Sequence, residues 1–338
     1  MPVSCAAPEP ANLVNATTIT REDLETRNIE ADTASMRARI ESFRDRTPVD
    51  TPRLIIDPAL PAPAAVDGRI PAIPAAQLDA ATLKANILSH GALLVRDYFP
   101  KSVIDTLPKA IDEVLHAVDL PREEKRALRS HYYSPPENLA SIMPEGAMEL
   151  GALRVFNTRV GAAMCAEAPS LAETLLEMFA ASGVKQLVGE YLGEAPCLSV
   201  KKWVVRRSAL PVEKAGWHQD GAFMGTDINT INLWLPLTTC GGDTGAPGMD
   251  VVPQRLHDIV SADGASFDWA VADSHVNEIF RDNPPIAPVF NAGDAFFFDH
   301  LYLHRTQYRE DFVRPRYAIE TWFFGESSFS KSQVPLAW

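Results

Sequence analysis

The spacing of apolar residues divides the chain into a helical first half and a strand-rich second half. In the first half, apolar side chains recur every three or four residues, the period of an α-helix, at residues 78–90, 101–118 and 171–192. Gly183 is expected to break the last of these segments and Gly193 to end it, because glycine readily adopts the left-handed backbone that follows helices. Between the first two segments, the apolar run at residues 92–95 predicts a short buried strand.

From Leu198 onward the period changes to two, the repeat of a β-strand. The segments with this alternation, or with short β-branched and aromatic runs, are residues 198–207, 231–237, 249–252, 286–290, 295–298 and 317–324. Turns rich in glycine, proline and aspartate separate them. Several short strands after a block of helices predict an α+β domain with a jelly-roll or barrel core, whose mouth can hold a ligand.

A charged helix is expected near the N-terminus, after a flexible lead of about 19 residues without periodicity. Thr20 with Asp23 resembles a capping box, and the apolar stripe that follows consists of Met36, Ile40 and Phe43. One narrow stripe predicts a helix that lies across the surface of its own chain. Contact with a partner subunit, and so a homo-oligomer, is the alternative.

The prolines of residues 48–76 predict an extended strap that leads into the compact part of the chain. We therefore expect two regions, an N-terminal extension at residues 1–75 and a compact domain at residues 76–338.

Composition narrows the function. The chain has 338 residues, 46% of them hydrophobic, enough for a large core. Its formal net charge of −13 argues against a general nucleic-acid binder, which needs a basic surface. No apolar run approaches the roughly 18 residues of a membrane span, so we expect a soluble, cytoplasmic protein. The scattered cysteines, Cys5, Cys165, Cys197 and Cys240, contain no C-x-x-C pair and are expected to be reduced and structural.

The segment Trp217-His218-Gln219-Asp220-Gly221 is the strongest chemical signal. If it is extended, His218 and Asp220 project to the same side and can reach one metal ion. Such a pair on its own is more often an exposed polar pair. A second imidazole further along the chain would complete the two-histidine, one-carboxylate set associated with non-haem Fe(II) oxygenases.

Residues 293–304 offer two candidates for that imidazole, His300 and His304, which would face the same side of an extended segment. His304 follows the Leu301-Tyr302-Leu303 run and precedes polar residues, as expected at a cavity mouth. His300, beside Asp299, is more easily a structural histidine. We favour His304 and keep His300 as the alternative.

Arg316 precedes the predicted strand at residues 317–324. If it is buried, it needs an anionic partner, and its planar guanidinium matches a carboxylate. The alternative is a surface ion pair with Glu310, Asp311 or Glu320.

Taken together, these motifs resemble those of the phytanoyl-CoA dioxygenase family of Fe(II)/2-oxoglutarate oxygenases. The resemblance is carried by His218-x-Asp220, Gly293-Asp294, His304 and Arg316-Tyr317-Ala318-Ile319, in that order. The opening segment Gly91-Ala92-Leu93-Leu94-Val95-Arg96-Asp97-Tyr98-Phe99 and the helix after it also look like the first strand and helix of that family. The likeness extends over roughly residues 76–325.

The resemblance implies a double-stranded β-helix core with flanking helices, in which three residues bind iron: His218, Asp220 and His304. It implies that Arg316 holds the distal carboxylate of 2-oxoglutarate. It also places three further residues in the cosubstrate pocket, Gln219, Trp234 and Thr306, of which Thr306 supplies a hydroxyl that could share the carboxylate with Arg316.

Three features depart from the family pattern. Arg305 replaces a small residue after the distal histidine and is expected to narrow the pocket or contact an anionic group. Residues 253–257 read Pro-Gln-Arg-Leu-His where the family tends to have Pro-Gly-Ser-His, which leaves a substrate role for His257 open. Residues 1–75 have no counterpart in the resemblance, and a lid or an oligomer contact is expected there.

The implied activity is oxidation of a small organic molecule by O2, through hydroxylation or a related C–H oxidation, with 2-oxoglutarate converted to succinate and CO2. Because Asp220 is present, no position is left for a halide, which disfavours halogenation. Without a basic cluster in the sequence, a free small molecule is favoured over a CoA thioester. The loop at residues 241–245 lacks a following lysine and is not a nucleotide site.

Two other functions compete with this one. A non-catalytic jelly-roll binding protein would be expected to lack at least one of the four key residues. A mononuclear iron enzyme that does not use 2-oxoglutarate would give Arg316 an ion-pair partner within the protein.

Overall fold

The computed structural model describes residues 19–50, 59–66, 69–121, 123–124, 147–262 and 269–338. Its strands are β1 Ala72–Pro74, β2 Ala92–Arg96, β3 Ala162–Met164, β4 Pro196–Arg207, β5 Trp217–His218, β6 Thr230–Pro236, β7 Met249–Val251, β8 Ala270–Val271, β9 Ala295–Phe298, β10 His304–Thr306, β11 Tyr317–Gly325 and β12 Pro335–Ala337.

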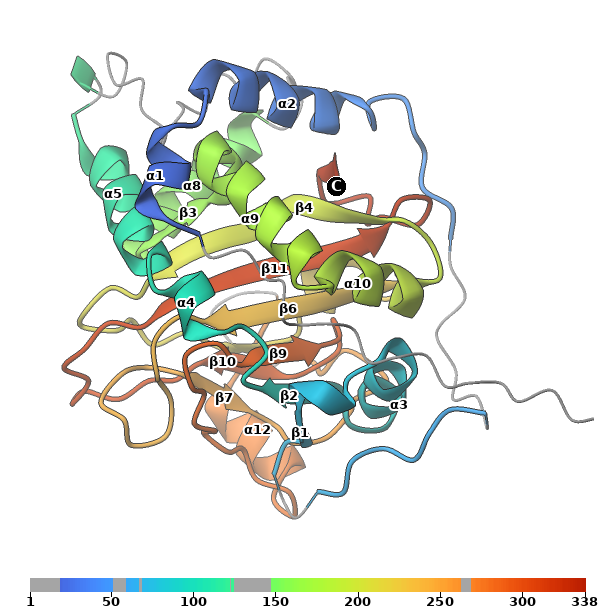
Figure 1. The fold of residues 1–338 in the computed structure, drawn as a ribbon. Coiled ribbons are helices and arrows are strands. Elements are labelled where there is room, and N and C mark those ends of the chain that lie inside the picture. The colour runs from blue at the N-terminus through green and yellow to red at the C-terminus, as the bar shows by residue number, and fades with distance from the viewer. Residues whose placement is uncertain (1–18, 51–58, 67–68, 122, 125–146, 263–268) are drawn as a thin grey trace, which may run out of the picture.

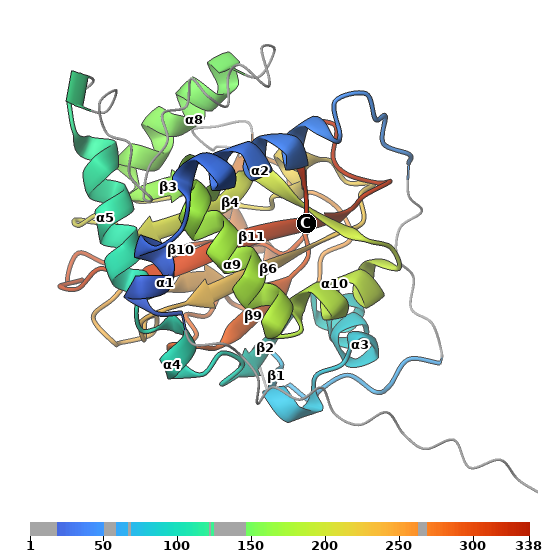
Figure 2. The same ribbon diagram turned by 45° about the horizontal axis from the view of Figure 1, so that its top comes forward.

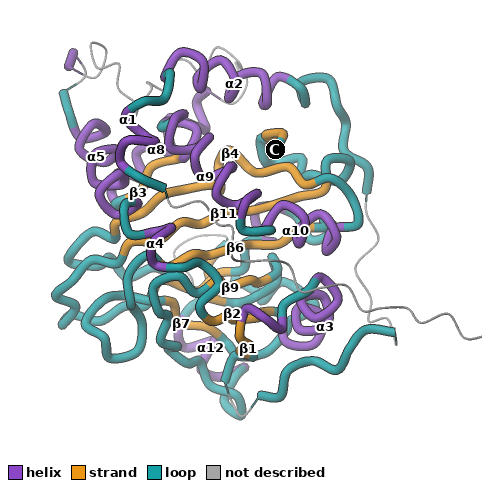
Figure 3. Tube along the Cα trace, viewed as in Figure 1, coloured by secondary structure: helices purple, strands orange, loops and turns teal. Residues whose placement is uncertain are grey.

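The helices, purple in Figure 3, lie mostly before β4 in the sequence order. They are α1 Arg21–Glu25, α2 Ile29–Glu41, α3 Ala80–His90, α4 Lys101–Ile104, α5 Leu107–Asp119, α8 Ala147–Arg159, α9 Pro169–Ala181, α10 Val184–Leu192, α11 Gly221–Met224 and α12 Asp273–Ile279, with short 3-10 turns at Ala75–Gln77 and Cys165–Glu167.

Two β-sheets form the core (Figure 1). The larger follows the order β1-β2-β9-β6-β11-β4-β12, with β3 also paired to β4, and the smaller follows the order β7-β10-β5-β8. Apart from the parallel pair β1 and β2, the strand pairs of the described chain are antiparallel, and most join strands that are distant in sequence. This arrangement confirms the expected double-stranded β-helix with flanking helices.

The larger sheet is buried on both faces, as strand β6 illustrates. Ile231, Leu233 and Leu235 of β6 belong to the core that the sheet shares with the helices. Trp234 belongs to a second core on the opposite face, which contains residues of both sheets. Helices α5, α9 and α10 cover the outer face in Figures 1 and 2, so the alternation in the sequence separates two buried sides rather than a buried and a solvated one.

Most of the predicted elements are present, with differences at their breaks. Gly183, with φ of +77°, separates α9 from α10, and Gly193, with φ of +76°, ends α10, both as expected. The helix predicted over residues 101–118 is interrupted after Ile104 and forms α4 and α5. The strand predicted at residues 286–290 is wrong, because this segment makes only isolated bridges at Ile286 and Phe290.

The N-terminal helices pack on the rest of the chain. The capping box of Thr20 and Asp23 begins α1 as predicted, but the single expected helix is two, α1 and α2. Met36 and Ile40 are buried in the same core as α9 and the sheet. Contact with the chain's own surface is thus confirmed, whereas a homo-oligomer and the boundary at residue 75 remain predictions.

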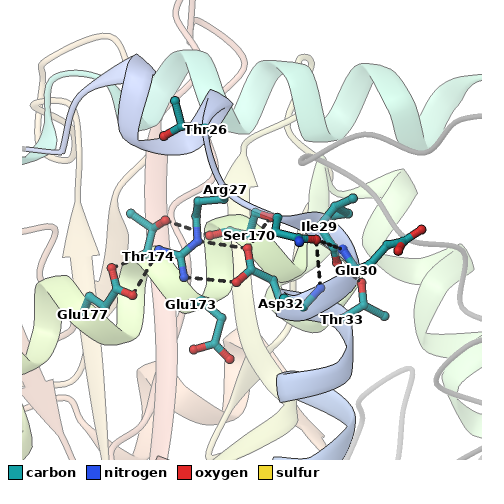
Figure 4. Close-up of polar contacts among 12 residues, drawn as sticks. Thr26, Arg27, Ile29, Glu30, Asp32, Thr33, Ser170, Glu173, Thr174 and Glu177 are labelled. Carbon is teal, nitrogen blue, oxygen red and sulfur yellow. Dashed lines mark hydrogen bonds and ion pairs between the residues drawn. The ribbon is translucent and has the colours of Figure 1, made fainter.

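A set of ion pairs holds this helical layer in place (Figure 4). The Arg27 guanidinium donates to the carboxylate of Asp32 at 3.0 Å and to that of Glu177 on α9 at 3.0 Å. The Ser170 hydroxyl, also on α9, donates to Asp32 at 2.6 Å. Buried charges here therefore have partners of opposite sign, the usual condition for burial.

Three of the cysteines, Cys165, Cys197 and Cys240, are buried free thiols, as expected for structural residues, and Cys5 lies outside the described residues. Within the described part of the chain, no helix has both the length and the apolar character needed to cross a bilayer.

Gly293 and Asp294 anchor the strand that leads to the candidate site. Gly293 has φ of +88°, and a Cβ placed there would lie 2.2 Å from the carbonyl oxygen of Phe99. The buried carboxylate of Asp294 accepts hydrogen bonds from the backbone N–H of Asp97 at 3.1 Å and of Asn291 at 2.8 Å. It thus joins the end of β2 to the turn before β9.

We predict that Gly293→Ala destabilises the fold by about 2–4 kcal/mol, because it combines a left-handed backbone with a steric clash. Denaturant unfolding measures this free energy. The matched control is Gly151→Ala in the exposed face of α8, where a Cβ meets nothing within 4 Å. That change should be neutral or stabilise by up to about 1 kcal/mol. Equal effects of the two substitutions would contradict the proposed role of the turn.

Candidate metal centre

Two strands from distant parts of the sequence bring the two histidines together. In the smaller sheet β10 pairs antiparallel with β5, and its His304 lies directly opposite His218. Opposed residues of such a pair have their Cβ atoms about 5 Å apart on the same face. The ring centroids of the two imidazoles are 4.4 Å apart.

Asp220 joins them by a route other than the predicted one. The chain is extended only as far as His218, and Asp220 has helical backbone angles, φ −63° and ψ −24°, before α11. The turn still returns its carboxylate, with Oδ1 3.8 Å from Nε2 of His218. One possible ligand atom from each of His218, Asp220 and His304 lies within 4.8 Å of the other two.

The hydrogen bonds of the histidines prepare them to bind a metal. Nδ1 of His218 lies 3.1 Å from the carbonyl oxygen of Gly216, and Nδ1 of His304 lies 2.9 Å from that of Tyr302. A carbonyl can only accept, so each Nδ1 carries the proton and each Nε2 keeps its lone pair. Burial, together with the nearby His304, lowers the pKa of His218 to about 3, which keeps its ring neutral.

The carboxylate of Asp220 is held ionised by a lysine that sequence reasoning missed. Burial opposes its ionisation, but the ammonium of Lys202, whose Nζ is 3.4 Å from Oδ1, is the largest contribution in favour of it, and the net effect lowers the pKa of Asp220. Lys202 lies on β4 and also approaches Glu320 at 3.8 Å. Nothing in the sequence around Lys202 indicates that this lysine contacts the carboxylate of Asp220. Two neutral imidazoles and one carboxylate form the ligand set of non-haem Fe(II) sites.

His300 is not part of this set. The extended geometry expected for residues 300–304 is wrong, because the chain turns between β9 and β10. Nε2 of His300 lies 3.0 Å from the carbonyl oxygen of Thr226, and its ring packs against Gly221, where a Cβ would lie 3.0 Å from His300 Cδ2. The glycine after Asp220 therefore makes room for a structural histidine.

Arg316 is buried, with 1% of its surface exposed. Its Nη1 donates to the carbonyl oxygens of Gly248 at 2.6 Å and Pro247 at 3.3 Å, while Nε is buried without a partner. The guanidinium lies 5.4 Å from the ring centroid of Trp234. Within the described chain, no carboxylate forms an ion pair with it, so the alternative of a pair with Glu310, Asp311 or Glu320 is wrong.

Burial lowers the pKa of Arg316 to about 10, so the group stays a cation at neutral pH. A buried cation without a counter-ion is costly, which makes this position suited to an anionic ligand. The two carbonyls lie just after the glycine-rich loop at residues 241–245, and Gly241 and Gly248 allow the backbone there to pack closely upon itself.

A cavity of about 650 Å³ is lined by His218, His304 and Arg316. Thr306 and Trp234 line it, as the resemblance implies. Phe223 and Trp269 add aromatic surface beside His218, with the Trp269 ring centroid 5.7 Å from that of His218. The cations along its wall are Arg159, Lys201, Lys202, Arg206, Lys214 and Arg316, three of them from residues 201–206 of β4.

Gln219 lies elsewhere, contrary to its expected place in the cosubstrate pocket. Its side chain is 1% exposed and donates to the carbonyl oxygens of Leu301 at 2.7 Å and Asp258 at 3.0 Å. Its Oε1 accepts from the N–H of Val260 at 2.8 Å. Both the nitrogen and the oxygen of this amide form hydrogen bonds, so Gln219 holds the loop around residue 258 against the segment that follows β5.

Arg305 contacts anionic groups of its own chain, one of the two expected outcomes. Its Nε donates to Asp250 at 2.9 Å, another nitrogen pairs with Asp273, and the guanidinium lies 4.6 Å from the centroid of the Trp217 ring. The question of a substrate role for His257, which the sequence leaves open, is not tested by these contacts.

Comparison with known proteins agrees with this geometry. The family model described as phytanoyl-CoA dioxygenase (PhyH) matches residues 87–309, a span that contains His218, Asp220 and His304. Arg316 lies beyond the match, so its role depends on the structure. No curated protein sequence matches the chain.

Among solved structures, EctD from S. alaskensis with 2-oxoglutarate and 5-hydroxyectoine is similar, with 13% identity, a TM-score of 0.54 and coverage of 85% of this chain and 87% of that one. The epimerase SnoN in complex with Fe3+, alpha ketoglutarate and nogalamycin RO has 17% identity, a TM-score of 0.44 and coverage of 75% and 86%. At these identities, the likeness to EctD concerns the fold alone.

We predict that His304→Gln removes stoichiometric binding of Fe(II), whereas His300→Gln leaves it unchanged. The first substitution removes a ring nitrogen that would bind the metal. In the second, the amide N–H of the introduced glutamine can still donate to the Thr226 carbonyl oxygen, as His300 does. Anaerobic calorimetric titration with Fe(II) measures both. If the His300 variant loses iron and the His304 variant keeps it, the ligand set is wrong.

Proposed function

The chain belongs to the phytanoyl-CoA dioxygenase family, and from this premise we propose that it oxidises a small organic molecule at a C–H bond while 2-oxoglutarate becomes succinate and CO2. As a member of the family it is an Fe(II)/2-oxoglutarate-dependent oxygenase. Bound iron, with 2-oxoglutarate and O2, supplies the oxidising power that the side chains themselves lack.

The residues present fit an iron ion. His218, Asp220 and His304 offer two lone pairs and a carboxylate within reach of one point. Hydrogen bonds hold these side chains in place. Backbone carbonyls fix the tautomers of the two histidines, and Lys202 orients the carboxylate of Asp220. These contacts support the proposal that the three residues hold the metal.

The observation that carries the proposed function is the guanidinium of Arg316. It is a buried cation without a carboxylate partner in the described chain, and it opens into the cavity that contains the metal ligands. The distal carboxylate of 2-oxoglutarate would supply the missing anion in a bidentate pair. Thr306 lines the same cavity and adds a hydroxyl donor to that carboxylate.

The two competing functions are less well supported. A binding protein without catalysis has no use for three side chains arranged as a metal set. An iron enzyme without 2-oxoglutarate would leave the Arg316 charge uncompensated, since no ion pair with a described residue neutralises it.

Hydroxylation or a related oxidation is favoured over halogenation, because Asp220 supplies the carboxylate ligand that a halide would replace. The substrate is a small molecule in this proposal, since one cavity of about 650 Å³ must hold both it and 2-oxoglutarate. During the reaction the protein's part is to hold the substrate against the aromatic wall, exclude water and keep 2-oxoglutarate in place through Arg316.

An anaerobic titration tests the cosubstrate site. Adding 2-oxoglutarate to the Fe(II)-loaded protein should produce a visible charge-transfer band. In Arg316→Leu the concentration that gives half the band should rise at least about 30-fold, the factor that corresponds to the loss of about 2 kcal/mol from a buried charge pair.

The control for this titration is Arg314→Leu, which removes an exposed arginine two positions earlier whose guanidinium bonds the Thr244 carbonyl. It should titrate like the unmodified protein. Iron binding without any band would favour the enzyme that does not use 2-oxoglutarate, and absence of iron binding would favour the binding protein.

We predict that Asp220→Ala abolishes the oxygen-dependent conversion of 2-oxoglutarate to succinate, because the proposed metal site loses the carboxylate that the protein supplies. Succinate formation is the measurement. Asp243→Ala, which removes an exposed carboxylate paired with Arg309, is the control and should keep full activity. A fully active Asp220 variant would refute the carboxylate assignment.

A further inference from the structure

A second guanidinium, that of Arg206, also faces the cavity. On β4, Arg206 is paired with Ala318 of β11, two residues along each strand from the contact of Ser208 with Arg316. Its neighbour Arg207 points to the opposite face and donates to Asp112 of α5 at 2.8 Å. Because side chains alternate along a strand, Arg206 and Arg316 lie on the same inner face.

Arg206 has no hydrogen-bond or ion-pair partner among the described residues. Its Nε is buried and makes no hydrogen bond, and none of the described residues forms an ion pair or hydrogen bond with its guanidinium. Other cations on the cavity wall are compensated. Arg159 pairs with Glu213 at 3.0 Å, Lys202 with Asp220 at 3.4 Å and Lys214 with Asp273 at 2.6 Å.

Two unpaired guanidiniums on one face call for two anions. The charge of Arg206 is close enough to be felt at Arg316, where it adds to burial in lowering the pKa. In the proposed function the distal carboxylate of 2-oxoglutarate neutralises the charge of Arg316, and the other carboxylate of 2-oxoglutarate would bind the metal. Arg206 is then left without an anion until another ligand enters the cavity.

We propose that Arg206 binds a carboxylate of the organic substrate, so that the enzyme acts on acids with an apolar body. This inference rests on the proposed function and deepens it. A single carboxylate balances this single cation, whereas a phosphate dianion would also meet Glu213 and Glu320, which line the same cavity.

The rest of the wall suits the apolar part of such an acid. Leu153, Phe156 and Val212 line the cavity, and Phe223 and Trp269 lie beside the metal ligand His218. An acid held at Arg206 therefore has its hydrocarbon portion among these side chains. The substrate's carboxylate sets the position of its hydrocarbon portion, and the aromatic surface excludes water from the carbon that reacts.

The experiment compares acids with their neutral counterparts on the whole protein, loaded anaerobically with Fe(II) and 2-oxoglutarate. The probes are hexanoate, decanoate and phenylacetate, each beside its primary amide, and binding is followed by calorimetry and by the change in the charge-transfer band. We expect at least one acid to bind about tenfold or more tightly than its amide.

In Arg206→Gln this preference should fall to a ratio near one, while half-saturation by 2-oxoglutarate stays unchanged. Arg206→Lys keeps the charge and should keep part of the preference, which covers the case in which the glutamine variant fails to fold. Arg207→Gln is the matched control, because it removes the adjacent arginine on the other face, and it should keep the full preference.

Three results would overturn the inference. They are an unmodified protein that binds no acid more tightly than its amide, a preference that survives in Arg206→Gln, and an Arg206→Gln variant whose only defect is weaker binding of 2-oxoglutarate. The last would make Arg206 a second cosubstrate residue. Because each is measured after the charge-transfer band has formed, these results are separate from failure of the proposed function, in which no band forms.

Discussion

The register between β5 and β10 is the constraint on which the site depends. It places His304 directly opposite His218, and the turn after β5 returns Asp220 to the same point. A shift by one residue would turn His304 to the other face and separate the ligand set. Much of the molecule serves to hold this register: the loop fastened by Gln219 supports one strand, and the turn at Asp294 supports the chain that leads to the other.

The arginines of the N-terminal helical layer have carboxylate partners, whereas two arginines of the cavity do not have one among the described residues. In the N-terminal layer, Arg27 and Arg39 each form a two-nitrogen pair with a carboxylate, so their burial is compensated within the chain. Arg316 and Arg206 have no such partner among the described residues. Arg316 is buried and Arg206 is partly buried, so under the two proposals above the ligands would supply the anions that the described chain does not.

Much of the fold and part of the site could be predicted from the sequence, because periodicity reports which residues share a face. The helices ending at Gly183 and Gly193 follow from it, and the residues that resemble the family motif, His218, Asp220 and His304, do converge. Gln219 was misplaced because adjacency in a motif is not adjacency in space. It follows β5 directly, and its side chain turns to the carbonyl oxygens of Leu301 and Asp258 instead of the cavity.

Lys202 and Arg206 show where sequence reasoning stops. Alternation along β4 indicates that they share a face, but not that this face borders a cavity or which cations there lack a partner. The net charge of −13 even suggests that anions are disfavoured. Yet the charge of the whole chain acts over distances at which salt screens it, whereas Arg206 and Arg316 act on a ligand in direct contact within a poorly solvated cavity. An acidic protein can therefore select an acidic substrate, provided that neighbouring strands turn their unpaired arginines to the same side.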